Sequence, residues 1–238
     1  MTRFFLPIVL LGGLSCAAAA QDKKPGLYPA MAPVEQYRMA SADEIALARS
    51  SAPPSISAHA TVLVMGARGY ETAVMGTNGF VCFVERSWTA DFGDPAFWNP
   101  KIRGPNCFNP PAVRSVLPQY IKRTEWALAG LGEAQMISRT RAAFAAHSFT
   151  APEPTSFGLM LSKQGYLGDE AGGPWLPHVM FFVPHGQAPA WGAGLDSSPV
   201  LGADGGPYEP TTLFVPVRRW SDGSPAPPAA PVEPHHEI

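Results

Sequence analysis

Three short apolar runs in the first third of the chain have the spacing of β-strands. They are ATVLVMG (60–66), YETAVMG (70–76) and GFVCFVER (79–86), separated by the segments ARG and TNG. Runs rich in β-branched and aromatic residues and bounded by turn residues are typical of strands. Because Asn78-Gly79 can supply the positive φ angles of a tight turn, we expect the second and third runs to pair as an antiparallel hairpin.

A helical pattern precedes these runs at SADEIALARS (41–50). Ser41 can cap the first turn, and Glu44, three residues on, can reach back and close a capping box. The Pro-Pro pair at 53–54 ends the helix.

Helical spacing returns in the middle of the chain. From Arg114, residues recur at steps of three and four that predict one amphipathic helix: Val116, Leu117, Tyr120, Ile121, Thr124, Leu128 and Leu131. Gly130 and Gly132 interrupt the pattern, and a second helix is expected from about Glu133 to near His147.

Strand-like runs follow these helices at 156–162, 178–184 and 211–220. Strands, helices and strands without regular βαβ alternation predict an α+β fold with a mainly antiparallel sheet and two or three helices. The run HVMFFV (178–183) is apolar on nearly all positions of both faces, which places it in the sheet interior.

We expect a single globular domain over residues 41–220. Residues 21–40 contain three prolines and read as an N-terminal leader. Residues 221–238 are rich in proline and alanine, which predicts a disordered tail.

The first 20 residues have the pattern of a signal peptide. Arg3 precedes an apolar run from Phe4 to Leu14, and small residues end at Ala20, before the expected cleavage site. No later segment approaches the roughly 20 apolar residues that a membrane-spanning helix needs, so we expect a soluble periplasmic or secreted protein. Lipid attachment at Cys16 is the alternative, although GLSC has Gly13 where a lipoprotein box has leucine.

The net charge bears on the class of partner, and the cysteine content bears on the stability of the fold. Without residues 1–20, 16 basic side chains stand against 19 acidic ones, a net charge of −3 that argues against nucleic-acid binding. The two remaining cysteines, Cys82 and Cys107, are expected to form a disulfide, which would stabilise the fold by roughly 3 kcal/mol in the loop-entropy account. Two free thiols are the alternative.

The long loop 87–112 carries the leading binding hypothesis. Aromatic side chains on a stapled loop can stack on a sugar or hold an apolar ligand, and this loop contains five of them: Trp88, Phe92, Phe97, Trp98 and Phe108. Alternatively, these rings fold inward as a small core under the loop. Asp91 and Asp94 beside them can form turns as well as bind.

His178 is the candidate for a catalytic role. It enters a predicted strand from a loop that contains Asp169 and Glu170, so it could act as a general base oriented by a carboxylate. The alternative is a ring that bonds a backbone carbonyl at the sheet edge. His185 lies at the other end of the run, roughly 23 Å away at about 3.3 Å per residue, so the two histidines do not form a pair.

Two further groups of charged residues are weaker candidates. Asp196, Asp204 and Glu209 lie in the glycine-rich segment 186–210, which suggests calcium binding or a lid, although the spacing fits no 12-residue calcium loop. The pair Glu85-Arg86 could act on a ligand in a cleft or form a solvated rim. The sequence contains no familiar nucleophile or phosphate-binding motif, and we expect no metal and no cofactor.

The export signal together with GTNGFVCFVERSW and PHVMFFVPHG resembles segments of uncharacterised secreted bacterial proteins. The resemblance covers most of the mature chain and implies a secreted globular domain, without catalytic or binding residues. The leading functional hypothesis is therefore an exported domain that binds a small or apolar ligand, or an envelope partner, through the aromatic loop. The alternatives are an unfamiliar hydrolase that uses His178 and a structural envelope protein.

Overall fold

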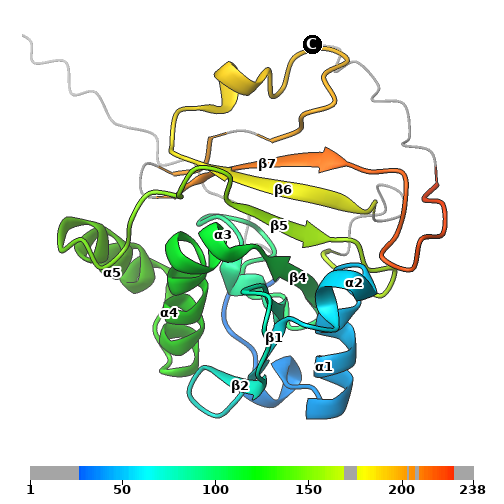
Figure 1. The fold of residues 1–238 in the computed structure, drawn as a ribbon. Helices are drawn as coiled ribbons and strands as arrows, with labels where there is room; N and C mark the ends of the chain where they lie inside the picture. Colours follow the sequence, from blue (N-terminus) through cyan, green and yellow to red (C-terminus); the bar gives the residue numbers. More distant parts are fainter. Residues whose placement is uncertain (1–26, 169–175, 203, 207–208, 228–238) are drawn as a thin grey trace, which may run out of the picture.

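The computed structural model describes residues 27–168, 176–202, 204–206 and 209–227, which build a seven-stranded mixed sheet with helices on both faces (Figure 1). The helices are α1 (Ser41–Arg49), α2 (Pro54–Ser57), α3 (Pro110–Ser115), α4 (Leu117–Leu128) and α5 (Glu133–Ala145), with 3-10 helices at Val34–Tyr37, Ser87–Thr89 and Ala188–Trp191. The strands are β1 (Thr61–Met65), β2 (Tyr70–Val74), β3 (Val81–Glu85), β4 (Gly104–Phe108), β5 (Phe157–Met160), β6 (His178–Val183) and β7 (Thr211–Pro216). The predicted α+β class is confirmed; α1, α4 and α5 are the expected helices, and α2 and α3 add four and six residues.

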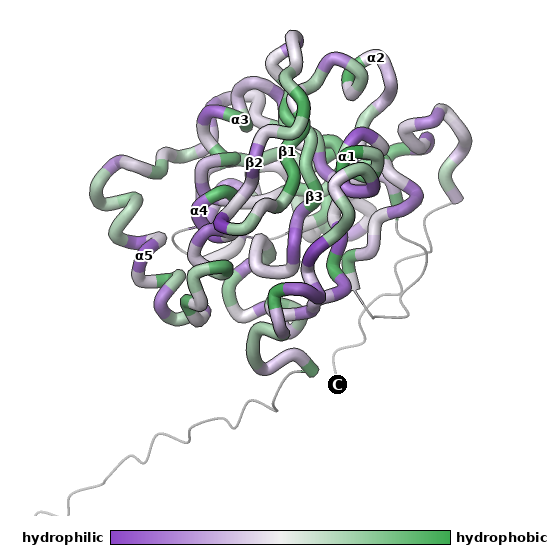
Figure 2. The backbone as a smooth tube through the Cα atoms, turned by 90° about the horizontal axis from the view of Figure 1, so that it is seen from below, coloured by the Kyte–Doolittle hydropathy of each residue, from purple (hydrophilic) through white to green (hydrophobic). Residues whose placement is uncertain are grey.

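The sheet has the order β2-β1-β3-β4-β5-β6-β7, and its two faces support separate cores. On one face α1 packs on Val62, Cys82, Val84 and their neighbours, while on the other α3 and α4 cover Leu63, Phe83, Phe108 and Met180. Figure 2 shows the apolar strands β1 and β3 between α1 and α4. The alternation of side chains along each strand therefore assigns Phe83 and Glu85 to the α4 face.

The expected pairing of the second and third runs is wrong. β2 pairs with β1 as an antiparallel hairpin that joins Met65 to Tyr70, whereas β3 lies on the other side of β1 and runs parallel to it. The tight connection is thus the segment 66–69, and residues 75–80 cross the start of β1. Asn78-Gly79 does adopt a turn, with φ of +77° at Gly79, but this turn belongs to the crossing.

Close backbone packing explains this path. The Thr77 amide donates to the carbonyl of His59 at 2.8 Å, and a Cβ on Gly76 would lie 2.2 Å from the Thr61 nitrogen. Asn78 donates through Nδ2 to the carbonyl of Ile56 at 2.8 Å. These contacts hold the segment against residues 56–61, so the chain reaches the far side of β1 instead of folding back on β2.

The expected capping box of α1 is also wrong. Ala40 is the N-cap residue and no side chain caps the helix, because Ser41 already lies in the first turn. Glu44 is 1 % exposed and turns into the protein, where it pairs with Arg86. The burial of a guanidinium group needs a carboxylate partner, and this need takes Glu44 away from the helix end.

Strand β4 lies inside the segment that the sequence suggested was a loop. Its first three residues, Gly104, Pro105 and Asn106, disfavour strand structure, but all five residues of GPNCF are buried between β3 and β5. Cys82 and Cys107 face each other across β3 and β4 with their Cα atoms 3.9 Å apart, and the predicted disulfide joins them.

Segments outside the expected domain bounds also contact the body. Tyr37 is fully buried, and its hydroxyl donates to the carbonyl of Trp98 at 2.8 Å. The Ser221 amide donates to the carbonyl of Leu161 at 2.8 Å. Residues 1–26, with the predicted signal peptide, and residues 228–238 of the predicted tail lie outside the described residues.

None of the helices within the described ranges combines the length and the apolar character needed to cross a bilayer.

Candidate functional site

A cavity of about 350 Å³ opens beside the end of β3, on the sheet face that α4 covers. Its floor is mainly apolar and includes Met160, Met180 and Phe214 from β5, β6 and β7. Polar side chains from three other segments line the wall, and they include Glu85, Arg86, Ser87, Asp91, Asp94, Gln119, Tyr120, Arg123, Asp204 and Glu209. A concave apolar site with a few polar groups is the usual form of a small-molecule site.

Glu85 is the last residue of β3 and lines this cavity. Asn106 donates through Nδ2 to Glu85 Oε1 at 2.5 Å, and the Thr89 hydroxyl donates to Oε2 at 3.3 Å. Burial raises the pKa of Glu85 to about 7, although these two hydrogen bonds and the charge of Arg123 act in the opposite direction. Glu85 can therefore hold or release a proton near neutral pH.

The position of Asn106 on β4 depends on Gly158 of the neighbouring strand β5. A Cβ on Gly158 would lie 2.5 Å from Asn106 Oδ1 and 3.0 Å from the ring of Phe108. Gly158 thus makes room for the amide that holds Glu85, since a larger residue would displace either the amide or the ring.

Arg123 projects from α4 into the opposite wall. Its guanidinium lies over the ring of Phe92, with Cζ 4.0 Å from the ring centroid, and Nη2 donates to the carbonyl of Ala90 at 2.6 Å. Nη1 lies 3.4 Å from Glu209 Oε1, and Glu209 also accepts a hydrogen bond from the Phe92 amide at 3.2 Å. Arg123 therefore connects the loop after β3 to the segment before β7.

The pKa values of Asp91, Glu209 and Tyr120 in the wall are all raised. Burial raises the pKa of Asp91 and of Glu209, while the charge of Arg123 lowers both. Burial also raises the pKa of Tyr120 well above its usual value, and the nearby charges of Glu85, Asp91 and Glu209 add to this effect. The charge of Arg123 acts in the opposite direction, so three carboxyl groups and one guanidinium group of the wall act on Tyr120.

Three buried polar groups of the wall have no hydrogen-bond partner among the described residues. They are the Nε2 amide of Gln119, the hydroxyl of Ser87 and the Nε of Arg123, and these residues are 6 %, 2 % and 8 % exposed. A buried donor without a partner is costly, and native proteins contain few of them. All three residues line the cavity.

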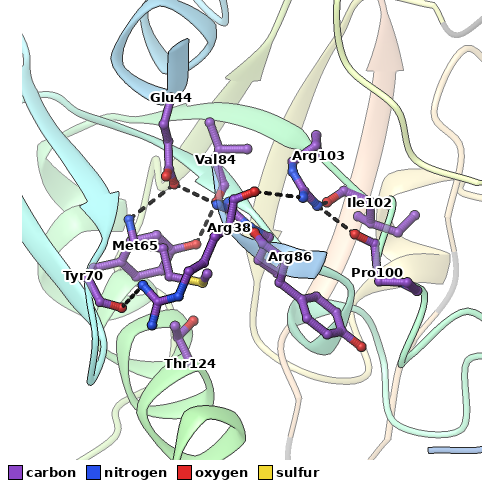
Figure 3. Close-up of polar contacts among 12 residues, drawn as sticks. Arg38, Glu44, Met65, Tyr70, Val84, Arg86, Pro100, Ile102, Arg103 and Thr124 are labelled. Carbon is purple, nitrogen blue, oxygen red and sulfur yellow. Dashed lines mark hydrogen bonds and ion pairs between the residues drawn. The ribbon is translucent and has the colours of Figure 1, made fainter. Parts of the chain in front are cut away.

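Arg86 is buried rather than exposed at a solvated rim. Its guanidinium donates to Glu44 at 2.9 Å, to the carbonyl of Val84 at 2.6 Å and to the carbonyl of Tyr37 at 2.7 Å. Figure 3 shows Glu44 reaching from α1 to Arg86 and to the backbone of Met65. Both residues of the predicted pair thus line the cavity, but the Arg86 guanidinium is already paired with Glu44.

Four of the five predicted ligand-binding aromatics are buried. Trp88, Phe97, Trp98 and Phe108 are between 0 % and 6 % exposed, and the first three pack with Tyr37 and Met136 under the loop. Trp88 also donates through Nε1 to the hydroxyl of Thr124 at 3.0 Å. These four rings form core under the loop and offer no free surface to a ligand. Phe92 is half-buried and supports Arg123.

His178 starts β6 and is 9 % exposed. Its Nδ1 lies 2.9 Å from the carbonyl of Leu176, and its ring contacts Phe214 with centroids 5.4 Å apart. Burial lowers the pKa of His178. Asp169 and Glu170, its predicted partners, lie outside the described residues, so their pairing with His178 stays a prediction.

The acidic residues of segment 186–210 do not gather at one point. Asp204 accepts hydrogen bonds from the amides of Gly186 and Ala188 and from the Thr211 hydroxyl, whereas Glu209 turns to Arg123. Within the described ranges, no three His, Cys, Asp or Glu side chains are grouped closely enough to hold a metal ion.

Sequence reasoning identified Glu85 but missed the wall residues Gln119 and Arg123 and the amide of Asn106 that holds Glu85. Asn106 lay in an assumed loop, and Gln119 and Arg123 lie one turn apart beside the apolar stripe of a helix. That four-residue spacing places two polar side chains next to each other, which was the one signal available.

Comparison with protein-family models, curated proteins and solved structures gave no match to this chain. The function of the site is therefore inferred from its own geometry.

Proposed function

We propose that the protein is exported from the cytoplasm and binds a small organic molecule in the cavity beside Glu85. The signal-like pattern of residues 1–20 and the Cys82–Cys107 disulfide support export, because disulfides persist in oxidising compartments. The ligand has an apolar body, to match Met160, Met180 and Phe214, and at least one hydrogen-bonding group.

The observation that carries this proposal is the unpartnered Gln119 amide. Gln119 lines the cavity, is 6 % exposed, and its Nε2 has no hydrogen-bond partner within the described structure. A ligand oxygen would satisfy this donor and compensate the cost of its burial. The loop 87–112 still contributes to binding, but through the wall positions Ser87, Asp91 and Ile102 and through the support that Phe92 gives Arg123.

Gln119→Leu tests the proposal, because leucine has a similar size and cannot donate a hydrogen bond. The native mass spectrum of the wild-type protein, purified from the cell envelope, should show a mass that is missing from the denatured spectrum. Gln119→Leu should lose this mass and keep the wild-type melting temperature or exceed it, because the unpaired donor is gone.

Gln187→Leu is the matched control, since Gln187 is exposed and does not line the cavity. It should retain the ligand. A retained mass that survives Gln119→Leu would contradict the proposed site. A bare wild-type mass, together with no thermal shift from a general compound library, would contradict the function.

A further inference from the structure

The cavity wall contains more carboxylates than guanidinium groups. Among the described residues, the wall has two guanidinium groups, from Arg86 and Arg123, and five carboxylates: Glu85, Asp91, Asp94, Asp204 and Glu209. Arg86 is already paired with Glu44, which does not line the cavity. Arg123 is therefore the one basic group left to balance the carboxylates of the wall.

The carboxylates are spread over the wall instead of converging on one point. Asp94 accepts a hydrogen bond from the Ala96 amide, and Asp204 from backbone amides of segment 186–188, so both also serve local turns. Glu85, Asp91 and Glu209 remain around Tyr120 and Arg123, and their charges raise the pKa of the Tyr120 hydroxyl. A spread of this kind suits a charged group on an organic molecule better than a single metal ion.

From this charge pattern and the buried unpartnered groups of Gln119 and Ser87, we propose that the ligand is a primary amine, bound as its ammonium ion. The inference rests on the proposed function and adds the chemical class of the ligand. The ammonium group is neutralised by Glu85 and Asp91, and the Ser87 hydroxyl can accept one of its hydrogens. Gln119 Nε2 donates to an oxygen elsewhere on the same molecule.

The wall also disfavours the opposite charge. A carboxylate or phosphate ligand would meet Glu85, Asp91 and Glu209. Arg123 already uses Nη1 for Glu209 and Nη2 for the carbonyl of Ala90, which leaves only its Nε to an anion. Like charges at short distance in a partly desolvated site repel strongly. The apolar floor of Met160, Met180 and Phe214 then selects an amine with an apolar body.

Glu85 links this binding to pH. A bound ammonium ion favours the ionised carboxylate, so Glu85 should release its proton when the amine binds. The charged or titratable groups that face it are Arg123 and Tyr120 from α4, Asp91 from the loop and Glu209 from the segment before β7. The amine should therefore bind more tightly as the pH rises through 7.

Isothermal titration with matched compounds tests the inference. The panel is led by 2-amino-1-phenylethanol, with 1-phenylethane-1,2-diol as its neutral counterpart and mandelate as its anionic counterpart. Further amines with apolar bodies are each paired with the alcohol and the carboxylic acid of the same skeleton. At pH 8 we expect each amine to bind more tightly than the alcohol and the acid of the same skeleton. The affinity of the amine should fall from pH 8 to pH 5.5 by at most about thirtyfold, which is the ratio of the ionised fractions of Glu85 at these two pH values for a pKa of about 7.

Glu85→Gln should weaken amine binding at pH 8 and remove most of its pH dependence, whereas Glu153→Gln, at an exposed ion pair, should change neither. Asp91→Asn gives a second, independent reduction in amine affinity. If the alcohols or acids bind as tightly as the amines, or if no amine binds, the inference is wrong. The proposed function is tested separately, by whether the wild-type protein retains a ligand and Gln119→Leu loses it.

Discussion

Replacing Glu85 by glutamine should stabilise the protein above neutral pH. Glutamine has the shape of glutamate and can accept the Asn106 hydrogen bond, but it has no charge to bury. In the wild-type protein, burial raises the pKa of Glu85 from the usual 4.5 to about 7. This difference corresponds to about 3 kcal/mol of unfolding free energy.

The sign follows from proton binding in the two states. Below pH 4.5 the folded and the unfolded chain both keep the Glu85 proton, so Glu85 makes no pH-dependent contribution. Between pH 4.5 and 7 the unfolded chain releases the proton while the folded chain keeps it, and stability falls as the pH rises. Above pH 7 both states are ionised, and the loss stays constant at about 3 kcal/mol.

Urea unfolding at several pH values from 4 to 8, with the disulfide intact, measures this effect. The difference in unfolding free energy between Glu85→Gln and the wild type should be small at pH 4 and should rise to about 3 kcal/mol in favour of the variant at pH 8. Glu153→Gln should show the opposite sign, because the pairing with Arg114 lowers the pKa of Glu153. Parallel stability curves for Glu85→Gln and the wild type would refute the assignment of Glu85 as a buried, proton-holding group.

Two further predictions concern the framework that holds the wall. Arg86→Met should destabilise the protein by about 3–5 kcal/mol in urea unfolding, because Glu44 keeps a buried charge without its partner, and the double variant with Glu44→Gln should recover part of this loss. If the double variant is less stable than Arg86→Met, the ion pair is not the cause. Replacing Cys82 and Cys107 by alanine should cost about 3 kcal/mol by the same method, and a cost near zero would show that the β3–β4 pairing does not need the covalent link.

Local sequence patterns predicted the elements in which apolar residues recur at the regular spacing of a helix or a strand. The apolar spacing from Val116 to Leu128 predicted α4, and HVMFFV predicted β6, because packing on the sheet requires these patterns. Strand β4 was missed, since Gly104, Pro105 and Asn106 have low strand propensity and only the neighbours on both sides stabilise them in a strand. The turn at Asn78-Gly79 was identified, but contacts with residues 56–61 decide where it leads.

The candidate site depends on contacts that no local pattern encodes. Asn106 is 21 residues from Glu85, and Glu209 is 86 residues from Arg123. Glu85 could be identified because the alternation of side chains along the run GFVCFVER places it at the end of an apolar strand. Its raised pKa could not, because burial depends on α4 and on the segment before β7, which the sequence does not place beside β3.

The hydrogen bonds of Tyr37 set an order of events during folding. A chain leaves the ribosome from its N-terminus, yet the partners of Tyr37 come later: its carbonyl accepts from Arg86, 49 residues on, and its hydroxyl donates to the carbonyl of Trp98, 61 residues on. Arg103 closes the same region by donating to the carbonyl of Gln36 at 2.9 Å, across 67 residues. Residues 27–40 are therefore made before their partners and dock late, because the loops that hold them close only after the β3–β4 segment has formed. Until then, residues 27–40 lack the partners that hold them against the sheet.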